Sequence, residues 1–180
     1  MRRLKTALAL SLLGSLYLMA PPARAQAPEA QTGSAGIRTD TPSGYPVPRF
    51  VGLKNARTFC RAGPSFDHPV VITYLKAGTP LLVVAETIDH WRKVRDIDGA
   101  ECWAHQTTLR ASSHVIAIQE TLLYARPDVT SAIKARLAPG VMAHIDRIDG
   151  GWTKISADGS AGWAETRRLW GVQGHIAPHN

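Results

Sequence analysis

The chain of 180 residues has 21 basic and 14 acidic side chains, 44% hydrophobic residues and two cysteines. This composition excludes a disordered, collagen-like or cysteine-stapled chain and fits one or two small folded domains. The formal charge of +7 includes four bases in the first 25 residues, namely Arg2, Arg3, Lys5 and Arg24. Without them, 17 basic and 14 acidic side chains leave a charge of +3, which gives no electrostatic argument for a nucleic-acid partner.

Residues 1–25 predict a signal peptide. A basic start precedes an apolar run over residues 6–20 that is short for a membrane span. Two prolines and Ala23-Arg24-Ala25 then supply a helix break and an A-x-A cleavage pattern. We therefore expect cleavage after Ala25, a periplasmic or secreted protein, and no stable membrane span afterwards. The alternative is an uncleaved N-terminal anchor.

Residues 26–48 change in composition to Ala, Pro, Gly, Ser, Thr and Gln, with few large apolar side chains. Such a segment buries too little surface to offset its ordering entropy. We expect a disordered linker here, a folded part from Arg49 onwards, and a short tail over residues 173–180.

The folded part contains an internal repeat. Residues 60–64 match 124–127, 75–78 match 137–140, 90–94 match 151–155, 98–99 match 158–159, and 102–104 match 162–164. The offset falls only from 63 at the prolines to 60 at the second tryptophans, as small loop deletions would cause. The sequence therefore predicts two tandem units, over residues 49–110 and 114–172.

Each unit contains short β-rich segments, which in the first unit are residues 70–75, 80–87, 91–96 and 101–105. Short strands separated by turn residues are typical of a small barrel or sandwich. Asp98-Gly99 and Asp158-Gly159 separate two of these strands at matching positions. Because a tight hairpin needs positive φ in its turn, Asp-Gly indicates a hairpin in each unit.

Several of these segments resemble exported bacterial Src-homology-3-like (SH3-like) proteins. They are residues 48–54, 61–65, 91–96 with 98–99, and 162–163 with 169–172. The resemblance covers about residues 44–172 and implies an all-β chain with two tandem small SH3-like β-barrels after the signal peptide and linker. It also implies no enzymatic activity. Cys60 departs from the pattern, where an aliphatic residue is usual, and so does Cys102, where glycine is usual.

The two cysteines are expected to form a disulfide. The second repeat has Tyr124 and Gly162 at the matching positions, and a bulky residue opposite a glycine suggests facing positions on adjacent strands. Strands of this barrel type bring the two positions together at a spacing that suits a disulfide, and export leads to an oxidising compartment. The alternative is a nucleophile pair, Cys102 with His105 or Cys60 with His68.

Four side chains are the expected ligand-binding residues. In the first repeat, Trp91 and Lys93 lie on the strand face opposite the aliphatic Val94. In the second repeat, Trp152 and Lys154 lie on the face opposite Ile155. In eukaryotic SH3 domains a tryptophan at the corresponding position lines the peptide groove, and the resemblance extends this role to Trp91 and Trp152. The alternative is that both rings cap the barrels or fill the interface between the repeats.

No metal site, cofactor or catalytic group is expected. His175 and His179 are four residues apart, but Pro178 and the terminal position disfavour a helix that would hold zinc. Together with the predicted export, the resemblance to exported bacterial SH3-like proteins implies a non-catalytic exported binding module for cell-wall (peptidoglycan) peptides or an envelope protein. The alternative function is a structural scaffold of the cell envelope whose barrels pack together without a ligand groove.

Overall fold

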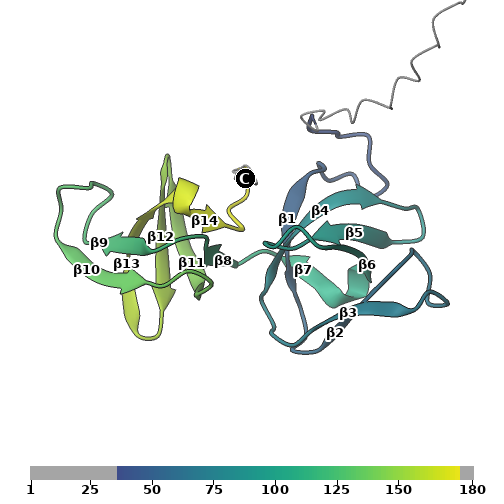
Figure 1. The fold of residues 1–180 in the computed structure, drawn as a ribbon. Coiled ribbons are helices and arrows are strands. Elements are labelled where there is room, and N and C mark those ends of the chain that lie inside the picture. Colours follow the sequence, from purple (N-terminus) through teal and green to yellow (C-terminus); the bar gives the residue numbers. More distant parts are fainter. Residues whose placement is uncertain (1–35, 175–180) are drawn as a thin grey trace, which may run out of the picture. The chain divides into compact units, whose positions relative to one another are not determined.

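The computed structural model describes residues 36–174, which belong to one compact unit. The predicted signal peptide with its cleavage after Ala25, the first part of the linker and the histidines of the tail lie outside the described residues. Strands make up nearly all the regular structure, in two seven-stranded antiparallel sheets (Figure 1). No helix among the described residues has the length and apolar character needed to cross a membrane.

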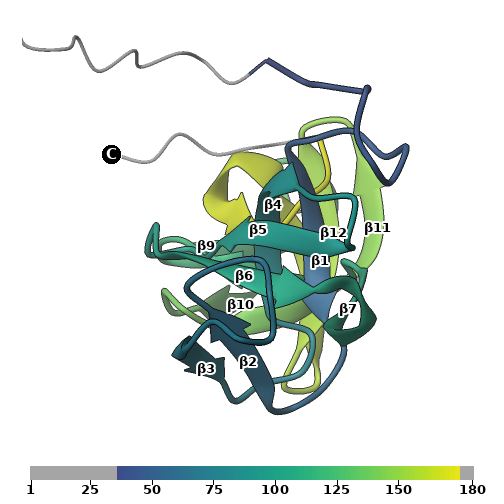
Figure 2. The same ribbon diagram turned by 90° about the vertical axis from the view of Figure 1, so that its right-hand side faces the viewer.

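The first sheet forms the N-terminal domain, with hydrogen-bonded order β3-β2-β6-β5-β4-β1-β7. In it β2 lies between β3 and β6 (Figure 2). A 3-10 turn, Gln106–Thr108, precedes β7. The strands are β1 (Arg49–Leu53), β2 (Thr58–Arg61), β3 (Val70–Tyr74), β4 (Pro80–Glu86), β5 (Trp91–Arg95), β6 (Glu101–His105) and β7 (Leu109–Ala111).

The second sheet forms the C-terminal domain and repeats this order strand for strand, as β10-β9-β13-β12-β11-β8-β14. Here too a 3-10 turn, Thr166–Arg168, precedes the last strand. The tandem repeat and the all-β architecture expected from the sequence are confirmed. The strands are β8 (His114–Ala117), β9 (Thr121–Tyr124), β10 (Ile133–Leu137), β11 (Met142–Asp149), β12 (Trp152–Ala157), β13 (Ser160–Glu165) and β14 (Leu169–Trp170).

Asp158-Gly159, in the second repeat, has the backbone that a tight hairpin requires. Asp158 and Gly159 have φ of 48° and 78°, and they join Ala157 to Ser160, which face each other across the hairpin. Positive φ at both central residues is the preferred two-residue turn because it follows the twist of the strands. In the first repeat the loop is longer, and the Asp96 carboxylate accepts hydrogen bonds from the N–H groups of Asp98 and Ala100.

The described part of the predicted linker, residues 36–48, differs from a disordered segment. Arg38 and Val47 exchange backbone hydrogen bonds of 2.8 and 2.9 Å, and Val47 is buried in the N-terminal core. The N–H of Ser43 also donates to Glu86 on β4. The segment is therefore ordered by the burial of Val47 and by these hydrogen bonds, although its composition predicted disorder.

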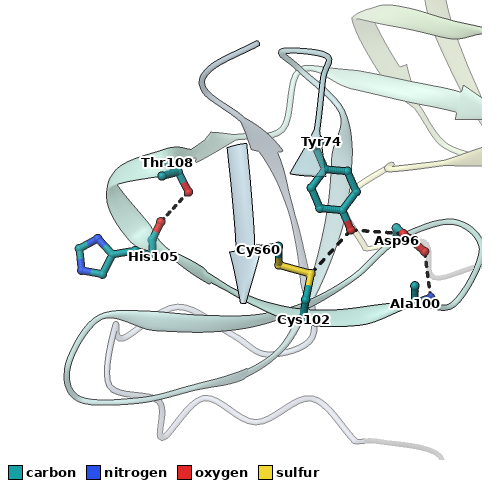
Figure 3. Close-up of a disulfide and its surroundings, with 7 residues drawn as sticks. All are labelled: Cys60, Tyr74, Asp96, Ala100, Cys102, His105 and Thr108. Atoms are coloured by element: carbon teal, nitrogen blue, oxygen red, sulfur yellow. Dashed lines mark hydrogen bonds between the residues drawn. A yellow bond between two sulfur atoms is a disulfide. The ribbon is translucent and has the colours of Figure 1, made fainter. Parts of the chain in front are cut away.

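The Cys60–Cys102 disulfide is present in the structure and links β2 to β6, with 5.6 Å between the Cα atoms. Figure 3 shows Tyr74 beside it, with its hydroxyl 3.8 Å from the Cys102 sulfur and donating to Asp96 at 3.2 Å. Burial, together with the charge of Asp96, raises the pKa of Tyr74 above its usual range. The phenol therefore stays protonated and keeps donating to Asp96.

The C-terminal domain replaces this link by close strand packing. A Cβ atom at Gly162 would lie 2.9 Å from the Cβ of Leu123 and from the carbonyl oxygen of Tyr124. Glycine therefore lets β9 and β13 approach in the second repeat, whereas a covalent bond joins the matching strands in the first.

The two domains are in contact through Trp170, which is 1% exposed. Its ring meets Phe50 edge to face with centroids 4.9 Å apart, and both pack with Leu82. Its indole N–H donates to the carbonyl of Pro80 at 3.3 Å. One aromatic side chain of the C-terminal domain thus fills a buried position against β1 and β4.

We predict that the double variant Cys60→Ala/Cys102→Ala loses about 4 kcal/mol of folding free energy, because the bond closes a long loop in the unfolded chain. Thermal melts with and without reductant, together with amide exchange, measure the loss. The protection of backbone amides from hydrogen exchange should fall first in the N-terminal domain, because the second repeat has no such bond. A melt that reductant leaves unchanged would contradict the prediction.

We predict that Gly171→Ala disrupts the contact between the domains. Gly171 has φ of +111°, and a Cβ there would lie 2.8 Å from the carbonyl oxygen of His114 and from Pro80. Amide relaxation should show the two domains tumbling more independently than in the parent chain. Gly151→Ala is the matched control, because nothing lies within 4 Å of its added methyl group; equal effects of the two variants would refute the prediction.

Candidate binding clefts

Trp91 begins β5 but does not present an open ring, because it is only 4% exposed. Phe66, from the loop between β2 and β3, and His105 on β6 cover it, with ring centroids 4.9 and 5.3 Å from that of Trp91. Phe66 is itself 66% exposed and lies beneath the Arg61 guanidinium. The structure thus differs from the outward, accessible ring expected at Trp91, since a loop folds over it.

Lys93 is engaged in an ion pair. Its ammonium group lies 2.6 Å from Glu101, and Arg95 binds the same carboxylate at 2.6 Å. Burial by itself would raise the pKa of Glu101, but hydrogen bonds from Lys93 and Arg95 and their charges lower it overall. A ligand at Lys93 would have to compete with this carboxylate.

Trp152, the counterpart of Trp91, is half-buried and packs edge to face on Tyr124, with centroids 5.6 Å apart. It lines a cleft of about 460 Å³ together with Glu165, Arg167 and Gln173. In the second repeat Val129 is the match of Phe66 at the offset of 63. Lys154 is exposed on the same strand and outside this cleft.

A larger cleft of about 810 Å³ lies where the two domains and the segment before β1 meet. It shares Ile148 and Gln173 with the smaller cleft. The Gln173 side chain also accepts a hydrogen bond of 3.0 Å from the N–H of Phe50. The basic side chains on its wall are Arg49, Arg92, Arg110, His90 and His144, and no Asp or Glu among the described residues lines it.

A buried ion cluster supports one side of this cleft. Arg49 and Arg92 both bind the carboxylate of Glu86, whose side chain has no exposed area, and Arg92 does so at 2.9 Å. Burial alone would raise the pKa of Glu86, but hydrogen bonds from Ser43 and Arg49 and the two positive charges lower it. Burial lowers the pKa of Arg92, partly offset by Glu86.

The residues of the larger cleft could not be identified from the sequence pattern. One signal was present, because Arg92 shares the inward strand face of Val94, where a charge requires a buried partner. That partner, Glu86, lies on another strand, and Arg49 was noticed only as part of a family motif. Among residues 36–174, no group of three or more His, Cys, Asp or Glu side chains is arranged to hold a metal ion.

His144 lines the larger cleft and contacts His114, which is next in sequence to the lining residue Ser113. The rings of His114 and His144 meet edge to face at 5.2 Å, and His114 is hydrogen bonded to Ser113 at 3.0 Å. Burial first, and then the charges of His144, Arg110 and Lys76, lower the pKa of His114. The folded protein therefore disfavours the protonated ring.

We predict that stability declines as the pH falls below about 6.5, the ordinary pKa of histidine. Below that pH the unfolded chain binds a proton at His114 that the folded chain resists, so protonation favours unfolding. Denaturant melts at pH 7.5 and 5.5 should show this difference, and His114→Gln should reduce it. His90→Asn is the control, since asparagine tolerates the positive φ of this exposed residue; an equal reduction there would exclude His114 as the cause.

Comparison with known proteins identifies the repeats. A family model described as "Bacterial SH3 domain" matches residues 54–111 and 118–171, and no curated protein matches the chain. Among solved structures, NlpC2 from Trichomonas vaginalis is 15% identical, with a TM-score of 0.31, over 67% of this chain and 47% of its own. NlpC1 from the same organism is 16% identical, with a TM-score of 0.30, over 67% and 45%. The chain thus spans less than half of either protein, and a likeness of this size does not bear on activity.

Proposed function

Since this chain belongs to the bacterial SH3 domain family, we propose that it is a non-catalytic, exported binding module that recognises peptides of the bacterial cell wall. The family match covers both repeats. The observation that supports the proposal best is the pair of adjoining clefts that share Ile148 and Gln173. Together they offer aromatic rings, of Trp152 in the smaller cleft and of Tyr45 and Phe50 in the larger one, beside arginine side chains.

The chemistry of the clefts suits an extended peptide. Tyr45, Phe50 and Ile145 supply apolar surface in the larger cleft, and Trp152 supplies an aromatic ring in the smaller one. Aromatic rings with apolar faces beside cations are well matched to peptides that bear carboxylates. An exported location is supported by the predicted signal peptide and by the disulfide, because disulfides persist in oxidising compartments.

A scaffold role is the second candidate, and the buried contact between the domains favours it. Trp170 is fully enclosed between β1, β4 and its own domain, as expected of a rigid spacer. The tryptophans proposed to bind ligand are not the ones that fill this contact, since Trp91 packs under Phe66 and Trp152 lines a cleft. This arrangement favours a binding module over a scaffold.

We predict that insoluble peptidoglycan retains the purified protein and that Trp152→Ala weakens retention about tenfold, the effect of losing one aromatic contact in a site. Co-sedimentation at several peptidoglycan concentrations measures the affinity. Lys154→Ala tests the neighbouring cation that the sequence pattern also assigned to the site. If wild-type protein stays in the supernatant, the proposal fails.

Phe66→Ala provides a control that also tests Trp91. This variant removes the exposed ring that covers Trp91 and lies outside both clefts. Unchanged retention would locate binding at the clefts, whereas a clear gain would show that Trp91 and Lys93 form a binding surface once uncovered.

A further inference from the structure

We propose that the larger cleft contains an anion subsite, formed by Arg49, Arg92 and Arg110, that binds a carboxylate of a peptide lying in the cleft. This inference rests on the proposed peptide-binding function. It adds the chemical group that is recognised and the residues that recognise it.

The ion cluster on the cleft wall has one positive charge in excess. Two guanidinium groups, of Arg49 and Arg92, share the single carboxylate of Glu86. Their side chains are 12% and 5% exposed, and that of Glu86 is fully buried. An uncompensated charge in such surroundings is costly, so an anion entering the cleft would be bound favourably.

The two guanidinium groups also have N–H donors to offer. Arg92 binds Glu86 through Nε, the carbonyl of Trp91 at 3.2 Å and the Gln106 side chain at 3.3 Å. Arg49 binds Glu86 and, at 3.2 Å, the carbonyl of Pro46. These bonds use three of the five N–H groups of Arg92 and two of the five of Arg49. Because these bonds fix the two guanidinium planes, the remaining N–H groups are already held in place before a ligand binds.

Arg110 adds a second uncompensated positive charge to the wall of the cleft. It is exposed, lines the same cleft, and forms no ion pair with any residue in the range 36–174. With His90 and His144 nearby and no acidic residue in the lining, the cleft attracts anions. The planar fork of arginine matches a carboxylate in two parallel hydrogen bonds.

The remaining wall selects a peptide over a simple polyanion. Tyr45, Pro46, Phe50, Ile145 and Ile148 give the cleft a largely apolar lining. A polyphosphate chain would leave this surface without a partner, whereas a peptide has both apolar side chains and carboxylates. A cleft of about 810 Å³ is also within the size range of sites that enclose small ligands.

The test uses the purified chain and a synthetic wall stem peptide with free carboxylates, compared with the same peptide fully amidated. Calorimetry should show binding of the free acid at least about tenfold tighter than that of the amide, the usual scale for one charged hydrogen-bonded contact. Arg110→Gln should remove most of this difference and reduce its dependence on salt. Arg57→Gln is the control, an exposed arginine outside both clefts.

Two further measurements separate the outcomes. Titration of the free acid should shift the guanidinium Nε–H signals of Arg49 and Arg92 in NMR spectra. Glu86→Gln, with its native fold checked by circular dichroism, should bind the acid more tightly than the parent chain. Equal affinity for acid and amide, or tighter binding of inorganic phosphate than of the peptide, would overturn the subsite. If the subsite fails in this way but peptidoglycan still retains the protein, the proposed function stands. If the protein prefers the free acid but peptidoglycan does not retain it, the subsite stands and the cell wall is not the source of the peptide.

Discussion

The packing of Trp170 against Phe50 and Leu82 is the contact on which the larger cleft depends. Trp170 lies on the last strand of the second repeat, yet its ring packs against residues of the first repeat. Gly171 then turns the chain where a Cβ would collide, so that Gln173 reaches the N–H of Phe50. Without this contact, the short link at residues 112–113 would be the main tie between the domains, and the larger cleft, whose wall comes from both, would lose its shape.

The two repeats solve the same structural problem by different means. Small domains bury little core and need additional stabilisation. The first joins β2 to β6 by the Cys60–Cys102 bond, and the second brings the matching strands into close contact through Gly162. The same divergence affects the tryptophans, because Phe66 covers Trp91 while Trp152 remains at a cleft. Equal topology therefore does not give equal surfaces.

The larger cleft is positively charged because two arginines share one glutamate. Glu86 is enclosed and holds both Arg49 and Arg92, so the cluster is well ordered but not neutral. In surroundings of low dielectric constant, such a cluster attracts an anion more strongly than it would in water. The unpaired positive charge also costs more free energy there. The segment before β1 contributes to this order, since Ser43 donates to Glu86 and Val47 is in the core.

The sequence by itself determined the tandem repeat, the strand pattern, the Asp-Gly hairpins and the pairing of Cys60 with Cys102. These features arise from local periodicity, from turn chemistry and from the comparison of one repeat with the other, all of which can be read along the chain. Only the tertiary structure decided that Phe66 covers Trp91, that residues 38–47 join the N-terminal domain, and that three arginines line one cleft. Each of these depends on contacts between segments far apart in the sequence, and side-chain alternation within a strand says which face a residue is on but not what covers that face.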